Sequence, residues 1–583
     1  MKKLIVTIIV LTALTLSLFA ANYQKTYLMS DEVWQKTNRL CIMNGALGPA
    51  PVSPTTGENI LRALKRLNYN SLSGKDKKIY NEIIAELDSA TNTAQFKGND
   101  YAFRMNVDAA LEGYIFNHTK STYLNEFFIP YQDRPSMLGV EGEVFVGNNL
   151  YLDFKYDLRD NYAGYVDDSG LRTTDSGYFY NFTNFSYFLS PRYTGGWETV
   201  TSDEHNMFNS TPLKAGASFG NHLYNFFIGR NRQAFGNGQT GNLVLGDNLP
   251  YQEFMKFEAS TDFITYELSL THFDNTQGDL ASSYDYGTND FTLNGEHQNR
   301  TIQRLDFNFS NRLRLAMNIG AIYNTDAPLD WRLIMPMALV HNWENLDEAI
   351  ELEAGDEGNN IMGFEIEYVL KPGIILSGQL VIDQFRIAVE KYSVVPDAYG
   401  FIANITKLKD RGNVTIQDQA EAVFTSPYLY LNTKTKDGKY HWGYDFIVGY
   451  AYNGTESLAY TGHPYGPGTI ALNLRRTYIY EKGSQLAFNA LVKLHGNKGI
   501  EYGYRNSNNQ HNQGADNNTS TSAILPTGYV ETTLRFDIAY SRPINEHLSV
   551  RLQGASISQW NYQNVKDEFK QSFQGAFGFR WVM

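Results

Sequence analysis

The stretch richest in binding chemistry is 229–250, where glycines alternate with amide and charged side chains. Asn, Gln, Asp and Arg each make several hydrogen bonds, and glycine lets a backbone approach a ligand closely. This combination suits hydroxyl-rich ligands such as carbohydrates. No Gly-Lys-Ser/Thr completes a phosphate-binding loop. The candidate ligand-binding residues are Arg230, Asn231, Arg232, Gln233, Asn237, Gln239, Asn242, Asp247 and Asn248.

Other constellations give no catalytic or metal chemistry. The 11 His residues form neither a His-Glu-x-x-His pattern nor an evident Ser/His/Asp set. The single cysteine, Cys41, provides no internal disulfide and no Cys-rich metal site. The acidic segment 344–357 could bind Ca²⁺, but its spacing fits no loop motif and favours a solvated acidic helix. We therefore expect no enzyme, no cofactor and no metal.

The elements that position these residues are strands with period-two alternation. In 138–158, apolar residues such as Val144 and Leu152 share one parity and charged residues such as Glu143 and Asp153 the other. Side chains on a strand point to opposite faces in turn, so one face suits lipid and the other water. This pattern is typical of an outer-membrane β-barrel.

The same hairpin pattern recurs along the chain from residue 101. Eight short turns are expected at 147–149, 220–222, 260–262, 310–312, 371–373, 436–439, 481–484 and 541–547. Nine long polar segments separate them: 116–137, 159–212, 232–251, 273–301, 323–362, 386–418, 453–468, 496–528 and 561–570. Nine outer loops and eight periplasmic turns predict an all-β, up-and-down barrel of about eighteen strands. The segments 177–190 and 331–341 are each a further strand or a loop insertion.

The chain before the barrel has two different parts. Residues 1–21, with Lys2 and Lys3 before an apolar run, are expected to be a cleaved signal peptide. Residues 22–99 contain three runs of helical periodicity around a Pro-rich linker, and 100–583 are assigned to the barrel. We expect a periplasmic helical region packed under or beside the barrel. The alternative is a partly ordered plug.

Composition agrees with an outer-membrane location. No later stretch contains eighteen uninterrupted apolar residues, so no transmembrane helix is expected. Tyr and Phe are abundant, at 40 and 35, and favour strands and membrane interfaces. The net charge of −13 becomes −15 without Lys2 and Lys3, which argues against a nucleic-acid partner.

Charged residues of both signs occupy the alternate strand positions that are expected to face the lumen. One hypothesis is a selective pore lining, and the other, which we favour, is a salt-bridged interior that braces a closed barrel. The residues chosen to represent the set are Arg104, Glu141, Glu143, Arg304, Arg314, Arg535 and Arg551.

The final strand carries Phe573, Phe577, Phe579 and Trp581 on one parity. A C-terminal aromatic strand resembles the signal that outer-membrane assembly machinery recognises. We therefore expect that machinery and outer-membrane lipid to be partners.

The stretch 229–250 resembles the Gly-Arg-Gln…Trp-Gly-Pro-Gly…Gly-x-Leu-x-Leu-Ser-x-Asn segment of the Wzi capsule-assembly family. Phe235 stands for the Trp, Asn237 for the Pro and Gly246 for the Ser. The helical N-terminal region, with a Pro-rich turn before the run at Ile60, and the eighteen strands are also similar. The resemblance implies a lectin-like outer-membrane barrel with a periplasmic helical bundle that holds capsular polysaccharide at the cell surface. This chain is longer, with loops such as the Asn-rich 503–528.

Two functions follow as hypotheses. The first is a barrel that binds surface or capsular polysaccharide and helps attach it to the cell. The alternative is a porin or substrate-selective channel. The 229–250 stretch is expected to be the binding segment, a plain extracellular loop or a constriction folded into the lumen.

Overall fold

A computed structural model gives the structure of the chain. It describes residues 22–92, 96–98, 100–117, 138–162, 205–208, 212–248, 252–274, 297–325, 335, 358–384, 397–431, 434–436, 439–441, 447–452, 455–498 and 523–583. The expected signal peptide at 1–21, the segments 177–190 and 344–357, and all of 331–341 except Met335 lie outside these residues.

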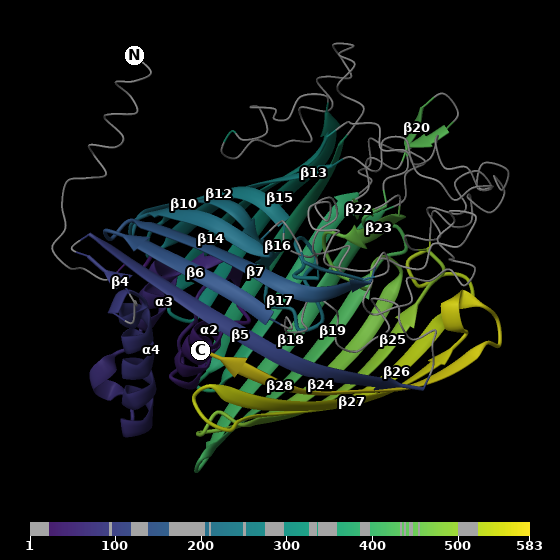
Figure 1. Ribbon diagram of the computed structural model, residues 1–583. Coiled ribbons are helices and arrows are strands. Elements are labelled where there is room, and N and C mark those ends of the chain that lie inside the picture. Colours follow the sequence, from purple (N-terminus) through teal and green to yellow (C-terminus); the bar gives the residue numbers. More distant parts are fainter. Residues whose placement is uncertain are drawn as a thin grey trace.

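Eighteen long antiparallel strands close into a barrel (Figure 1) in which the last strand pairs with the first, as the sequence predicted. The two short strands β4 (Phe96–Lys97) and β8 (His205–Phe208) extend its sheet. The barrel strands are β5 (Tyr101–Phe116), β6 (Leu138–Val146), β7 (Leu150–Tyr162), β9 (Lys214–Gly220), β10 (Tyr224–Asn231), β12 (Gln252–Ser260), β13 (Ile264–Asp274), β14 (His297–Ser310), β15 (Leu313–Thr325), β16 (Gly358–Lys371), β17 (Ile374–Gln384), β18 (Ala398–Arg411), β19 (Val414–Thr425), β24 (Thr469–Tyr480), β25 (Gln485–His495), β26 (Glu531–Pro543), β27 (Leu548–Trp560) and β28 (Phe569–Val582).

One expected hairpin is in the wrong place. The turn expected at 436–439 joins β20 (Lys434–Lys436) to β21 (Lys439–His441), a small sheet separate from the barrel. The barrel turn is at Gly412 and Asn413, inside the segment assigned to an outer loop. Alternation failed there because β18 carries inward Ile402 and Leu408 but outward Lys407 and Lys409. The predicted number of strands is still correct, because the wrongly expected turn at 436–439 compensates for the missed turn at Gly412 and Asn413.

The outer wall is apolar. Phe573, Phe577, Phe579 and Trp581 of the final strand are all exposed on the face turned away from the lumen. The hairpin that first showed alternation, β6 to β7, places Glu143 and Asp153 inward, where both are buried. No described helix is long and apolar enough to cross a membrane.

Three helices lie at the end of the barrel that carries the short turns, here called the turn end (Figure 1); the opposite end is the loop end. They are α2 (Glu32–Met43), α3 (Gly57–Leu64) and α4 (Gly74–Asn92), with a 3-10 turn at Tyr69–Ser71. Trp34, Leu40, Ile60 and Ile83 share one buried core. Burial raises the pKa of Cys41 to about 12, so its thiol stays protonated.

The linker between α2 and α3 enters the lumen. Arg314 Nη2 donates to Gly48 O at 2.9 Å, and Lys256 Nζ donates to Pro54 O at 2.6 Å. β2 (Val52–Ser53) then pairs with β11 (Ala234–Phe235), and β1 (Thr26–Tyr27) pairs with β3 (Thr55–Thr56). The helices therefore lie at the turn end, and the linker between α2 and α3 occupies part of the lumen.

Buried ion pairs cross-link the lumen wall. Arg304 on β14 lies 2.8 Å from Asp306 and 2.5 Å from Glu365 on β16. The Arg304 guanidinium is 1% exposed, so each charge depends on its partner for solvation. This network ties two strands on either side of β15.

Replacing Arg304 with Met should destabilise the barrel by about 3–5 kcal/mol, because Asp306 and Glu365 would stay buried without a cation. Urea unfolding in detergent micelles, followed by tryptophan fluorescence, measures the difference. Arg542→Met, an exposed arginine beside a turn, is the control. Equal stability of the two variants would contradict a structural role for the network.

Candidate functional site

The stretch that suggested carbohydrate chemistry folds inside the barrel. After β10 the chain turns inward, and β11 pairs with β2 of the N-terminal linker. Phe235 also forms a bridge with Leu245, which closes residues 236–244 into a loop. The loop (residues 232–248) therefore matches the constriction proposed among the alternatives, and it meets the linker in the lumen.

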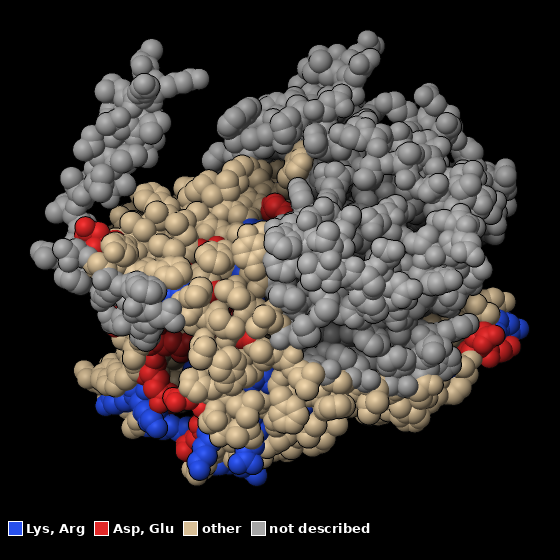
Figure 2. All heavy atoms as spheres, in the orientation of Figure 1, with Lys and Arg blue, Asp and Glu red and all other residues tan. Residues whose placement is uncertain are grey.

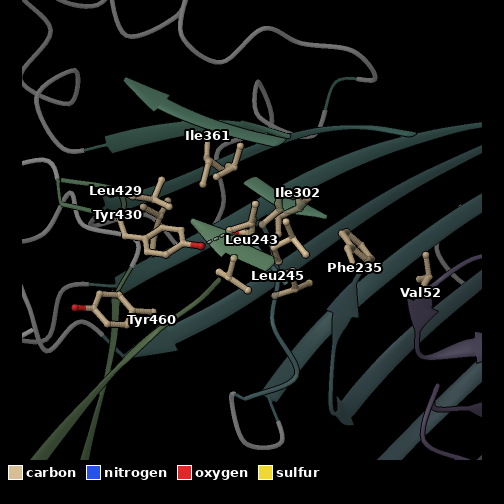
Figure 3. Packing of buried hydrophobic residues seen from close by; sticks show 14 of the residues in the cluster. Val52, Phe235, Leu243, Leu245, Ile302, Ile361, Leu429, Tyr430 and Tyr460 are labelled. Carbon is tan, nitrogen blue, oxygen red and sulfur yellow. Dashed lines mark hydrogen bonds between the residues drawn. The ribbon is translucent and has the colours of Figure 1, made fainter. Parts of the chain in front are cut away.

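An apolar patch seats this loop against the wall (Figure 3). Leu243, Val244 and Leu245 are buried, and Tyr430 and Ile302 lie beside them in the same cluster. Full burial of a Val or Leu side chain contributes about 1.5–3 kcal/mol. The wall residues of this cluster come from eight strands, β14 to β19, β24 and β25: Ile302, Ile322, Ile361, Val381, Ile402, Val423, Ala471 and Leu491.

Glu421 on β19 holds the tip of the loop. Its carboxylate accepts hydrogen bonds from the backbone N–H of Gln239 at 2.5 Å and of Thr240 at 2.9 Å. The Thr240 hydroxyl donates to the same carboxylate at 2.6 Å. Three donors satisfy a wall carboxylate that is 1% exposed, so the wall and the loop tip depend on each other.

Amide side chains of the wall fix the loop on either side of this tip. Gln379 accepts from Leu243 N at 2.9 Å and donates to Asn242 Oδ1 at 2.7 Å. Asn404 donates to the carbonyl of Asn237 at 3.1 Å. The same Asn242 oxygen accepts from Gly238 N, which closes the tip on itself. These contacts set one conformation for the backbone of the loop.

Tyr430 and His463, which lie between β19 and β24 in the chain, hold the opposite side of the seated loop. The Tyr430 hydroxyl donates to Leu243 O at 2.6 Å (Figure 3) and accepts from His463 N at 2.9 Å. His463 Nδ1 accepts from Tyr465 N at 3.2 Å, which leaves Nε2 to carry the proton toward Thr240 Oγ1, 3.2 Å away. Burial lowers the pKa of His463 to about 3, so the ring is neutral near pH 7.

Most of the predicted binding residues hold the loop. Arg230 pairs with Glu253, and Gln233 donates to Thr271 at 2.9 Å and accepts from Ser269 at 2.6 Å. Asn231 Oδ1 accepts from Arg232 N at 2.9 Å. Asn237 donates to Glu367 at 3.2 Å, and Asn473 donates to Gln239 Oε1 at 3.3 Å. These amides serve as anchors to the wall.

Three of the predicted residues lie together at the loop end, and they are called the outer patch: Arg232, Asp247 and Asn248. Arg232 Nη2 donates to Asp247 O, and Asn248 donates to Tyr460 O at 3.0 Å. The Asp247 side chain is exposed. The patch sits where β10 ends and β12 begins, above the seated loop.

The predicted lumen charges are inward, and most are paired. Arg104 pairs with Glu143, and Glu141 lies 3.7 Å from Lys214. Arg314 lies 2.5 Å from Glu367. The other pairs are Arg304 with Glu365 and Arg535 with Asp537, while Arg551 has no ion pair among the described residues. Their geometry is that of a braced interior.

Sequence reasoning missed the wall residues that seat the loop. Glu421, Gln379 and Asn404 each lie on a strand at an inward position, as many scaffold residues do. His463 lies in a segment that was assigned to a plain outer loop. Only the contact of distant segments identifies these residues, and single-sequence spacing carries no such signal.

The loop should be held less firmly in acid. The unfolded chain binds a proton at His463 below about pH 6.5, but the folded chain does so only near pH 3. The contribution of neutral His463 to the free energy of unfolding is therefore fully present above pH 6.5. It is lost as the pH falls toward 3, because the unfolded chain takes up a proton first. Limited proteolysis in detergent should cut 232–248 faster at pH 4.5 than at pH 7.5, and His463→Gln should flatten that profile. An equal profile in both proteins would contradict this role.

Replacing Glu421 with Ala should loosen the loop tip by about 1–3 kcal/mol, because three donors lose their acceptor. Hydrogen exchange at Gln239 and Thr240 should accelerate, while exchange in β27 stays unchanged. Glu481→Ala, at an exposed turn, is the control. Unchanged exchange at the tip would show that the carboxylate does not hold it.

Comparison with known proteins identifies the architecture. No family model matches the chain, and no curated protein matches it. Among solved structures, the chain is similar to Wzi of Escherichia coli, described as an outer-membrane protein of group 1 capsule assembly and a carbohydrate-binding β-barrel. The TM-score is 0.53 at 12% identity, covering 95% of this chain and 98% of that one.

Channel proteins are also similar, at lower scores. OprD of Pseudomonas aeruginosa matches with TM-score 0.39 and 8% identity, over 84% of this chain and 97% of that one. DcaP of Acinetobacter baumannii matches with TM-score 0.33 and 8% identity, over 84% and 100%. These likenesses concern the fold, and each of these proteins is an outer-membrane barrel. The chain is an outer-membrane β-barrel of eighteen strands.

Proposed function

We propose that this barrel binds a surface or capsular polysaccharide at its loop end and helps attach it to the cell surface. The observation that carries the proposal is the seated loop: residues 232–248 cross the lumen and present the outer patch at the mouth. A loop fixed to the wall by buried contacts provides a rigid floor, which lowers the entropic cost of holding a ligand.

The chemistry of the outer patch suits a sugar polymer. Asp247 offers an exposed carboxylate that accepts from hydroxyl groups. Arg232 and Asn248 hold the backbone around it through their hydrogen bonds to Asp247 O and Tyr460 O. Hydrogen bonds to a charged group contribute about 1.5–3 kcal/mol each. The carbohydrate-binding barrel Wzi supports the proposal by its similar fold. No catalytic step is part of this function.

A substrate-selective channel is the second candidate. The observation that favours it is a set of inward cations on β24 to β27 that are less buried than Arg304. Arg475 is exposed, and the Arg535 side chain is 26% exposed. Such a row could conduct anionic solutes if the seated loop moved aside.

Replacing Asp247 with Ala should weaken retention of surface polysaccharide about tenfold, the equivalent of about 1.4 kcal/mol for one hydrogen bond to a carboxylate. Purified protein immobilised in detergent is incubated with polysaccharide from the source cell, and the bound sugar is measured against dextran. Asp262→Ala is the matched control, because its carboxylate is 99% exposed at the turn end.

Two results would contradict the proposal. Retention by D247A equal to that of the unmodified chain would remove the outer patch from the binding site. Failure of the unmodified chain to retain any surface polysaccharide would remove the function itself.

A further inference from the structure

A row of cations faces the membrane near the turn end. Lys407, Lys409 and Arg411 occupy alternate positions of β18, opposite in parity to the buried Ile402, Thr406 and Leu408, so they point outward. All three are exposed, and none forms an ion pair within the described part of the chain. Ionisable groups on a lipid-facing wall are costly unless a partner compensates them, so such a row calls for one.

An outward-facing ion pair continues this row of cations on the neighbouring strands. In the sheet register Lys407 stands opposite Asp418 of β19, and Asp418 stands opposite Arg476 of β24. Arg476 Nε lies 2.5 Å from an Asp418 oxygen, and the two side chains are 54% and 36% exposed. Counting outward positions, four cations face one carboxylate, which leaves a net positive patch.

An apolar groove of about 1000 Å³ begins at this patch and runs across β18, β19 and β24 to β28. Its rim consists of outward residues that are at least 41% exposed: Ile405, Leu474, Phe488, Phe536, Ile538 and Phe573. Small outward residues, Ala420, Ala490, Gly554 and Ser556, form its floor. Thirteen of the nineteen lining residues, including the whole rim and floor, have outward parity, so the groove lies on the lipid face.

The depth of the patch matches a membrane interface. Tyr478 and Tyr480 follow Arg476 on β24 at outward positions toward the turn end, and Tyr540 lies opposite Leu552 on that face. Tyrosines gather at the level of lipid headgroups. Figure 2 shows one gathering of Lys, Arg, Asp and Glu at the lower left, toward the end that carries the helices, and a smaller one at the far right.

We propose that this groove holds an anionic phospholipid of the leaflet at the turn end. Its phosphate lies against Lys407 and Lys409, the cations without an ion pair among the described residues, while Arg476 stays paired with Asp418. Its acyl chains run along the floor at Ala420 and Ala490. Charge complementarity selects the occupant, because a phosphodiester supplies the anion that the row lacks. The small floor residues leave room for acyl chains between aromatic rims.

A second copy of the chain fits this patch less well. A two-fold contact would place the same surface on both partners. If the two-fold axis passed through the cation row, Lys407, Lys409 and Arg476 of one copy would approach the same cations of the other. Like charges facing each other in a low-dielectric environment repel strongly. The groove therefore favours lipid as its occupant.

The test measures lipid that stays bound to the full chain. Protein stripped of lipid in detergent is mixed with phosphatidylglycerol or phosphatidylcholine, and native mass spectrometry counts bound lipids after detergent release. We expect one phosphatidylglycerol per barrel, retained at least tenfold better than phosphatidylcholine. The double variant Lys407→Gln/Lys409→Gln should lose this preference at least tenfold. It disturbs no ion pair, so folding should be preserved, and heat-modifiable gel mobility checks this.

The double variant Lys482→Gln/Lys566→Gln removes two exposed lysines outside the groove and should keep the preference. Equal retention of the two lipids by the unmodified chain would overturn the proposal, as would an unchanged preference in the Lys407/Lys409 variant. A dimer mass in place of bound lipid would also overturn it and assign the groove to a second copy. Polysaccharide retention is a separate readout, so this result is independent of the proposed function.

Discussion

The constraint on which the structure depends is that lipid offers no hydrogen-bond partner to a backbone. The eighteen strands satisfy this constraint because each one forms backbone hydrogen bonds with two neighbours, and β28 closes the barrel by pairing with β5. Closure fixes the parity of every strand, so one face must be apolar and the other encloses a lumen. Exposed Phe577 and Trp581 outside, and buried Glu143 and Arg304 inside, follow from that one requirement.

The closed wall creates a second requirement, because a lumen must contain water, side chains or inserted chain. Here two inserted segments meet, the linker carrying β2 and the loop carrying β11, and each satisfies part of the other's backbone. Glu421 and Gln379 provide charged and amide partners at the wall, and Leu243 supplies apolar burial. Under the proposed function, this rigid centre leaves the loop end as the place where the polysaccharide would bind.

Alternation and turn residues were sufficient to predict the barrel, because period-two burial is local to each strand. The prediction failed at β18, where inward Leu408 and outward Lys407 reverse the expected pattern. Composition singled out the stretch 229–250, but it did not indicate that Gln233 and Asn242 would contact the barrel wall. Whether an amide faces a ligand or a strand depends on contacts between segments far apart in sequence, and no single-sequence pattern contains them.

A barrel that holds polymer at its loop end and does not conduct solutes requires the seated loop to close the lumen. Conductance of the purified full chain in planar lipid bilayers tests it most directly, beside a variant in which residues 237–242 are replaced by a short Gly-Ser linker. We expect the unmodified chain to be silent and the variant to give discrete current steps. Steady open-channel steps from the unmodified chain would contradict it.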